Sequence, residues 1–213
     1  MALPILHDYF RSSAAYRVRI ALALKGVDYD HRIVNLAHDD QQLAEFRARN
    51  PQGLIPCLEI DGHVLTQSLA ICDYLDASYD QAPFVPKDPA TRSHVLALAL
   101  TVACDIHPIN NLRILKYLTG QLGVDDSAKD AWYRHWVIEG LAALEALAAP
   151  RAGAFLFGDA PTLADICLVP QLYNARRFKV AIAAFPTLRR ADETASALPA
   201  FAAAHPDRQE QMS

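Results

Sequence analysis

The order in which strand and helix patterns alternate near the N-terminus limits the possible folds of this chain most strongly. An apolar pattern at residues 4–9 indicates a strand, a polar turn follows, and residues 16–25 carry the spacing of a helix with one apolar face. Gly26 stands where helices commonly end in a left-handed residue, and residues 31–35 indicate a second strand. A strand–helix–strand unit of this kind favours a parallel pair of strands.

The residues that follow add an antiparallel element. A helix is expected within 38–49, and Asp61-Gly62 joins two short apolar runs. An Asp-Gly pair in this setting is the strongest short-range signal for a β-hairpin. Ser68 is expected to cap a helix over 69–79. The complete order is β-α-β, a connecting helix and β-β-α, which predicts an α/β thioredoxin-like domain.

A proline-rich segment at 81–89 separates this domain from a second one. Beyond Pro89 the chain shows only helical periodicity, with expected helices over 89–119, 127–149, 163–174 and 186–195. Thr162 and Asp165 have the form of a capping box at the start of the third of these helices. We therefore expect a thioredoxin-like domain over 1–82, a linker over 83–87 and an all-helical domain over 88–213, with an exposed tail from His205.

Composition and charge argue against several classes of partner. The 213 residues carry a formal net charge of −4, which gives no general attraction to nucleic acid or to anionic membranes. The most apolar stretch, near 95–103, is too short to span a bilayer and the N-terminus lacks a basic signal region, so we expect a cytoplasmic protein. The four cysteines form no CxxC pair and are expected to be buried free thiols. The eight histidines form no HExxH motif, so no metal site is expected.

Three turns at one end of the predicted sheet carry the residues best suited to bind a ligand. In Arg11-Ser12-Ser13, a hydroxyl at a helix N-terminus could donate to an anion, and a bound thiol there would have a lowered pKa. Ile55-Pro56 opens a strand, where a cis bond would turn the backbone of Ile55 toward a ligand. Gln67-Ser68, at a helix start, could hold a carboxylate. Each serine could equally be an ordinary helix cap.

Segments along nearly the whole chain match, in order, the pattern of one protein family. They are Arg11–Gly26, Asn50–Pro56, Gln67–Ile71, Cys104–Leu115, Leu163–Gln171 and Asn174–Val180. Together they resemble zeta-class glutathione transferases, the maleylacetoacetate and maleylpyruvate isomerases. The resemblance implies the glutathione transferase fold, glutathione as the cofactor and a homodimer.

The resemblance also implies roles for individual residues. Ser12 would support the glutathione thiolate, with Ser13 beside it and Arg11 in the same turn. Further glutathione contacts would come from Gln41, the Ile55 backbone, Gln67, Ser68, His107 and Asn111. The carboxylates of a small dicarboxylate substrate would be bound by Arg11, Arg113 and Arg177, because a guanidinium can bind a carboxylate through two hydrogen bonds. Solvent-exposed helix arginines are the alternative interpretation.

Two positions depart from the family pattern. Ala14 stands where the family commonly has cysteine, so side activities that need an enzyme thiol are in doubt. Leu112-Arg113 stands where some maleylpyruvate isomerases carry two adjacent arginines, which makes that subtype less certain. The isomerisation itself would survive, because its thiolate comes from glutathione.

The expected reaction is reversible thiolate addition to a cis enone, rotation about the former double bond and elimination of the thiolate. The stabilised enolate would be held by Ser13, Arg11 or backbone N–H groups. One alternative is a general transferase or dehalogenase that acts on α-halo acids by displacement. A non-enzymatic structural or scaffolding module is the other.

Overall fold

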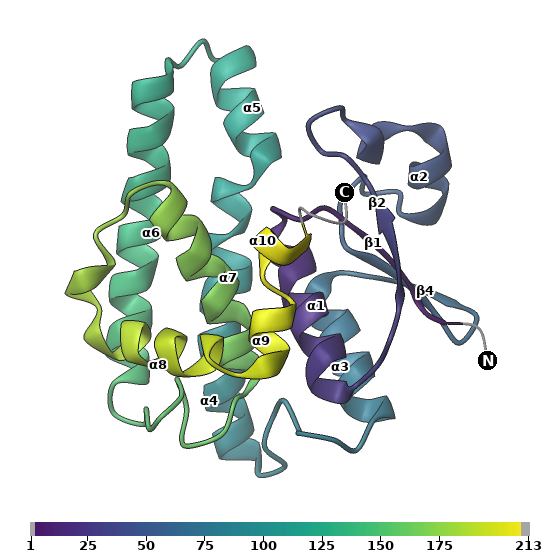
Figure 1. Ribbon diagram of the computed structural model, residues 1–213. Helices are drawn as coiled ribbons and strands as arrows, with labels where there is room; N and C mark the ends of the chain where they lie inside the picture. The colour runs from purple at the N-terminus through teal and green to yellow at the C-terminus, as the bar shows by residue number, and fades with distance from the viewer. Residues whose placement is uncertain (1–2, 210–213) are drawn as a thin grey trace. The chain divides into compact units, whose positions relative to one another are not determined.

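The computed structural model describes residues 3–209, which form two compact units (Figure 1). The first unit runs to Phe84 and also includes the segment that starts at Leu198, whereas the second unit is Val85–Ala197. The expected domains assigned the whole of 88–213 to the helical domain, whereas the segment that starts at Leu198 belongs to the first unit.

A four-stranded sheet organises the first unit. The strands are β1 (Ile5–Asp8), β2 (Asp30–Ile33), β3 (Cys57–Ile60) and β4 (His63–Thr66), in the order β2-β1-β3-β4. β1 and β2 are parallel, and β3 and β4 form an antiparallel hairpin, as the sequence pattern predicts. β1 and β3 are also antiparallel. The thioredoxin-like fold of this unit is confirmed.

Helices α1 (Ser13–Lys25) and α3 (Ser68–Ser78) pack against each other beside the sheet (Figure 1). Their apolar faces are fully buried with the sheet residues Leu6 and Leu58. Gly26 ends α1 in the left-handed region at φ 64°, as expected, and the N–H groups of Gly26 and Val27 donate to the carbonyls of Ala23 and Leu22. Ser68 is not the N-cap of α3: Gln67 takes that position at φ 67°.

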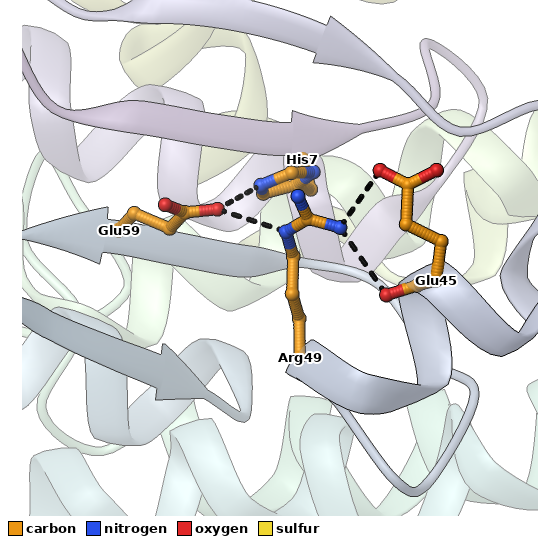
Figure 2. Close-up of polar contacts among 4 residues, drawn as sticks. All are labelled: His7, Glu45, Arg49 and Glu59. Atoms are coloured by element: carbon orange, nitrogen blue, oxygen red, sulfur yellow. Dashed lines mark hydrogen bonds and ion pairs between the residues drawn. The ribbon is translucent and has the colours of Figure 1, made fainter.

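The expected helix over 38–49 is divided into the 3₁₀ turn η1 (Asp40–Gln42) and α2 (Ala44–Arg49), because Leu43 is extended. Figure 2 shows the polar contacts that connect α2 to the sheet residues His7 and Glu59. Arg49 Nε donates to Glu59 Oε1 at 3.2 Å, and Arg49 Nη1 donates to Glu45 Oε1 at 3.2 Å. His7 Nε2 lies 2.7 Å from the same Glu59 oxygen, and this hydrogen bond is the main cause that lowers the pKa of Glu59.

The tail expected from His205 is only partly exposed: Asp207 and Arg208 are exposed, but the tail forms α10 (Pro206–Gln209). It follows α9 (Pro199–Ala203), which packs against α1. Phe201 is fully buried, and Pro206 and Gln209 are buried as well. Residues 210–213 of the expected tail lie outside the described part of the chain.

The second unit is helical, as expected. Its elements are α4 (Pro89–Leu100), the π-helix η2 (Thr101–Ile106), η3 (Pro108–Asn110), α5 (Leu112–Gly120), α6 (Asp126–Ala148), α7 (Leu163–Arg177), η4 (Ile182–Ala184) and α8 (Pro186–Ser196). The capping box is confirmed: Thr162 N donates to Asp165 Oδ2 at 2.8 Å, and Thr162 Oγ1 accepts from Ala164 N. The expected continuous helix over 89–119 is interrupted, because Pro108 lacks an N–H group and Asn111 begins a new helix.

Judged by length and composition only, Pro89–Gly120 would suffice to cross a membrane, so the apolar region is longer than the stretch near 95–103 expected from the sequence. A core helix meets the same test, and α4 packs against α7 within its unit. Only part of the cysteine prediction is confirmed: Cys57, Cys72 and Cys167 are buried, but Cys104 in the π-helix is exposed.

Candidate functional site

The turn between β1 and α1 places a serine hydroxyl at a helix N-terminus. Ser12 is the N-cap of α1, and its Oγ accepts a hydrogen bond from Ala15 N at 3.2 Å. Ser12 N donates to Tyr9 O at 2.8 Å, which closes the turn. Because the backbone N–H occupies an acceptor site of Oγ, the hydroxyl hydrogen stays available to donate to a ligand. Ser12 can therefore cap the helix and bind an anion at the same time.

The other two residues of this turn differ in exposure. Arg11 is exposed, and its guanidinium carbon lies 4.8 Å from the centroid of the Phe10 ring. Ser13 is only 4% exposed, as the first residue of α1. Arg11 is thus the more accessible of the two groups that could meet a substrate.

Three further predicted residues of the first unit lie in three separate segments: Gln41 in η1, Ile55 before β3, and Gln67 between β4 and α3. The Ile55–Pro56 peptide bond is cis, and Ile55 is buried. Gln67 is exposed and its Nε2 donates to Gln52 Oε1 at 2.8 Å. Gln41 is buried, with Nε2 donating to Asp39 Oδ1 at 3.0 Å. Its Oε1 has no hydrogen-bond partner among the described residues.

Ser68 contacts a residue that the sequence did not single out. Arg17 Nη1 donates to Ser68 Oγ at 3.3 Å, and both side chains are buried. Within residues 3–209, Nε and Nη2 of Arg17 have no hydrogen-bond partner. A buried cation without a carboxylate partner is costly, and its field favours an anion nearby. The N-terminus of α3 therefore combines a hydroxyl, the first-turn N–H groups of the helix and a positive charge behind them.

The sequence signal for Arg17 is that its neighbours in α1 are mostly apolar. Val18, Ile20, Ala21 and Leu22 are all fully buried, and Arg17 and Arg19 are buried among them. Helical periodicity alone does not show that other segments also cover α1 on this side, so it assigns both arginines to solvent.

The four predicted residues of the helical unit lie on or near two helices. Asn111 is the N-cap of α5, and its Oδ1 accepts from Arg113 N at 3.1 Å. Arg113 is exposed and His107 is half-buried. Arg177 is exposed, and so is its neighbour Arg176. Arg176 pairs with buried Asp192, whereas Arg177 Nη1 donates to Asn174 Oδ1 at 3.1 Å.

Residues that could hold a metal ion are not grouped: between residues 3 and 209, no three His, Cys, Asp or Glu side chains come together in this way. The arrangement instead provides hydroxyl groups, backbone N–H groups and cations. Such groups bind anions and stabilise a thiolate or an enolate.

Comparison with known proteins gives matches over almost the entire chain. The family described as "Glutathione S-transferase, N-terminal domain" matches residues 11–78, and "Glutathione S-transferase, C-terminal domain" matches residues 130–207. A "Probable maleylacetoacetate isomerase" of Vibrio cholerae is 51% identical over 208 residues, which is 96% of each chain.

Solved structures agree with this. The structure of a bacterial maleyl pyruvate isomerase, described as a zeta-class glutathione S-transferase in its holo form, has a TM-score of 0.94 and 44% identity, covering 96% of this chain and 98% of that one. A maleylacetoacetate isomerase from Anaeromyxobacter dehalogenans, with dicarboxyethyl glutathione and citrate bound in its active site, has a TM-score of 0.87 and 44% identity, covering 97% and 96%.

Proposed function

This chain belongs to the zeta class of glutathione S-transferases, and we propose that it isomerises maleylacetoacetate or maleylpyruvate from cis to trans with glutathione as its cofactor. The observation that carries the proposal is the match, over nearly the full length, to relatives described as these isomerases. The related structure with a glutathione adduct and citrate supports a small dicarboxylate as the substrate class.

The residues of the first unit fit glutathione. Glutathione is an anionic tripeptide that needs donors for its carboxylates and its thiolate. Arg17 offers a buried positive charge behind Ser68, and Ser12 offers a hydroxyl at a helix N-terminus. We assign the γ-glutamyl carboxylate to Gln67 and Ser68, the cysteinyl unit to the Ile55 backbone and the glycyl end to Gln41.

Ser12 would act on the thiol of glutathione. Its O–H would donate to the sulfur while Oγ continues to accept from Ala15 N. The positive end of the α1 dipole favours the thiolate over the thiol. Both effects lower the thiol pKa without any protein cysteine, which accounts for the tolerance of Ala14 in this turn.

Glutathione supplies the nucleophile, whose thiolate adds reversibly to the cis enone so that the former double bond can rotate before elimination returns the thiolate. The chain's own residues orient the substrate and stabilise negative charge. Arg11 would donate hydrogen bonds to the enolate oxygen or to a substrate carboxylate, because it is exposed in the turn that presents Ser12. Arg113 and Arg177 would bind substrate carboxylates, and His107 and Asn111 would contact glutathione from the helical unit.

Two finer points belong to the same proposal. We expect a homodimer from the family resemblance. We also expect a cytoplasmic location, as inferred from the sequence composition. In the dehalogenase alternative, the same glutathione thiolate would displace halide from an α-halo acid. In the scaffold alternative, the protein would catalyse no reaction.

One set of assays tests the proposal. The purified protein should convert maleylacetone to its trans isomer only when glutathione is present, and it should do so faster than it releases halide from dichloroacetate. Parallel rates with maleylacetoacetate and maleylpyruvate then identify the preferred substrate. If the protein neither binds immobilised glutathione nor isomerises maleylacetone, the non-enzymatic scaffolding role would be supported instead.

A further inference from the structure

Arg19 is a second buried arginine of α1, and its guanidinium contacts three separate segments of the first unit. Nη1 donates to Asp8 Oδ2 at 2.6 Å, Nη2 donates to Phe10 O at 3.1 Å, and Nε donates to Ala204 O at 3.0 Å. The side chains of Arg19 and Asp8 are both 0% exposed. One planar group therefore joins the end of β1, the turn before Ser12 and the backbone directly after α9.

The contact with Phe10 lies within the thiolate turn. Phe10 is flanked by Tyr9, whose carbonyl accepts from Ser12 N, and by Arg11, whose guanidinium lies over the Phe10 ring. A shift of the Phe10 carbonyl would therefore move both Ser12 and Arg11.

The contact with Ala204 links the turn to the C-terminal segment. Phe201 is fully buried in α9, which packs against α1, so this side chain fixes the position of the Ala204 carbonyl. A guanidinium has a rigid fork of donors, so it cannot move toward one acceptor without lengthening its bonds to the others.

The ion pair with Asp8 keeps Arg19 in place. Burial alone would raise the pKa of Asp8, but the charge and hydrogen bonds of Arg19 and His31 hold it below its ordinary value. His31 Nε2 lies 3.0 Å from the same Asp8 oxygen. Asp8 is thus a buried carboxylate that holds the guanidinium in place through Nη1. The other two donors, Nη2 and Nε, connect the Phe10 carbonyl to the Ala204 carbonyl.

We infer that Arg19 is a positioning residue that couples the C-terminal segment Leu198–Gln209 to the turn presenting Ser12 and Arg11. The coupling is a property of the first unit alone, and only its catalytic consequence rests on the proposed function. Loosening α9 should disturb the turn although no residue of α9 belongs to the proposed glutathione site.

Two variants separate this role from a general contribution to stability. Phe201→Ala leaves the side chains of Arg19 and Asp8 unchanged and removes the fully buried side chain of α9. Arg19→Lys keeps a positive charge opposite Asp8 but cannot donate in three fixed directions. Leu75→Ala is the matched control, because Leu75 is also fully buried in the same unit. Leu75 lies in α3 next to Asp76, which binds Lys25 at the C-terminal end of α1, far along the helix from the Ser12 turn.

Amide hydrogen exchange in the absence of glutathione is the first readout. We expect the Ser12 and Ala15 amides to exchange about tenfold faster or more in Phe201→Ala and in Arg19→Lys, because their hydrogen bonds define the turn and the cap. The Leu75→Ala control, compared at equal loss of global stability, should leave these two amides near their wild-type rates. Equal exchange in Phe201→Ala and the control would overturn the inference, and Phe201→Ala alone decides it if Arg19→Lys fails to fold.

Catalysis is the second readout. A displaced turn should lower kcat on maleylacetone about 10- to 100-fold and raise the thiol pKa of bound glutathione, with a smaller change in the KM for glutathione. If the wild type does not isomerise maleylacetone, the proposed function fails, and the exchange rates still decide the coupling.

Discussion

Replacing Arg17 with methionine should weaken glutathione binding while the free protein keeps or gains stability. Arg17 is 2% exposed, and two of its nitrogens, Nε and Nη2, have no partner within residues 3–209. Its Nη1 donates to Ser68 Oγ at 3.3 Å. The free protein therefore bears the cost of a buried cation, and in our proposal a carboxylate of bound glutathione compensates for it.

General energetics gives the size of the effects on glutathione binding and on stability. A hydrogen bond that involves a charged group contributes about 1.5–3 kcal/mol. Losing one such bond between Arg17 and glutathione would therefore raise the Kd for glutathione roughly 10- to 150-fold. Replacing buried charge with an apolar side chain of similar volume is neutral or stabilising by about 1–4 kcal/mol. Methionine is unbranched and adapts to the space that the arginine stem leaves.

Calorimetric titration with glutathione measures the first effect, and urea unfolding without glutathione measures the second. Arg32→Met is the matched control, because Arg32 is an exposed arginine of the same unit and should change neither quantity appreciably. A variant that binds glutathione with the wild-type Kd, or that loses more than about 2 kcal/mol of stability, would refute the reasoning, since it would mean that Arg17 already has a structural partner.

Three further predictions concern single groups. Burial raises the pKa of Asp165 to about 6, so the native state binds its proton more tightly than the unfolded state. As the pH rises from about 4 to 6, wild type should therefore lose up to about 3 kcal/mol relative to Asp165→Asn in urea unfolding, and a difference that does not vary with pH would contradict this. Arg177→Ala should lower kcat/KM for maleylacetone about tenfold or more without changing the Kd for glutathione, whereas Arg189→Ala, a likewise exposed helix arginine, should change neither; full activity in Arg177→Ala would remove that residue from the mechanism. Cys104 is exposed, so an aromatic disulfide reagent should label it in the native protein without loss of isomerase activity. The buried Cys57 thiol, whose pKa burial raises to about 11, should react only after unfolding, and native labelling of it would show that the β3 core opens.

Local sequence rules predicted the elements whose ends depend on neighbouring residues. The left-handed Gly26, the Asp61-Gly62 hairpin and the Thr162 capping box follow from backbone preferences within a few residues, and the structure has all three. The placement of Ser12 at the start of α1 was predictable for the same reason. Ser68 shows the limit of these rules: it resembles an N-cap, but Gln67 occupies that position in a left-handed conformation, and the Ser68 hydroxyl binds Arg17 instead.

Features that depend on distant segments could not be predicted in this way. Arg17 and Arg19 are buried because α3 and α9 pack against α1, and helical periodicity does not contain this information. The C-terminal segment is polar in composition after His205, which suggested an exposed tail. Its buried position depends on Phe201 and on the Ala204 carbonyl, whose partner lies 185 residues earlier in the chain.

The most direct test of the proposed function is the rate of maleylacetone isomerisation at several glutathione concentrations, for wild type and Ser12→Ala. The proposal predicts no enzyme-catalysed reaction without glutathione. It also predicts a loss of about 100-fold in kcat/KM for Ser12→Ala, with a raised thiol pKa of bound glutathione. Isomerisation that proceeds without glutathione, or a Ser12→Ala variant with the wild-type rate and thiol pKa, would contradict the role given to this turn.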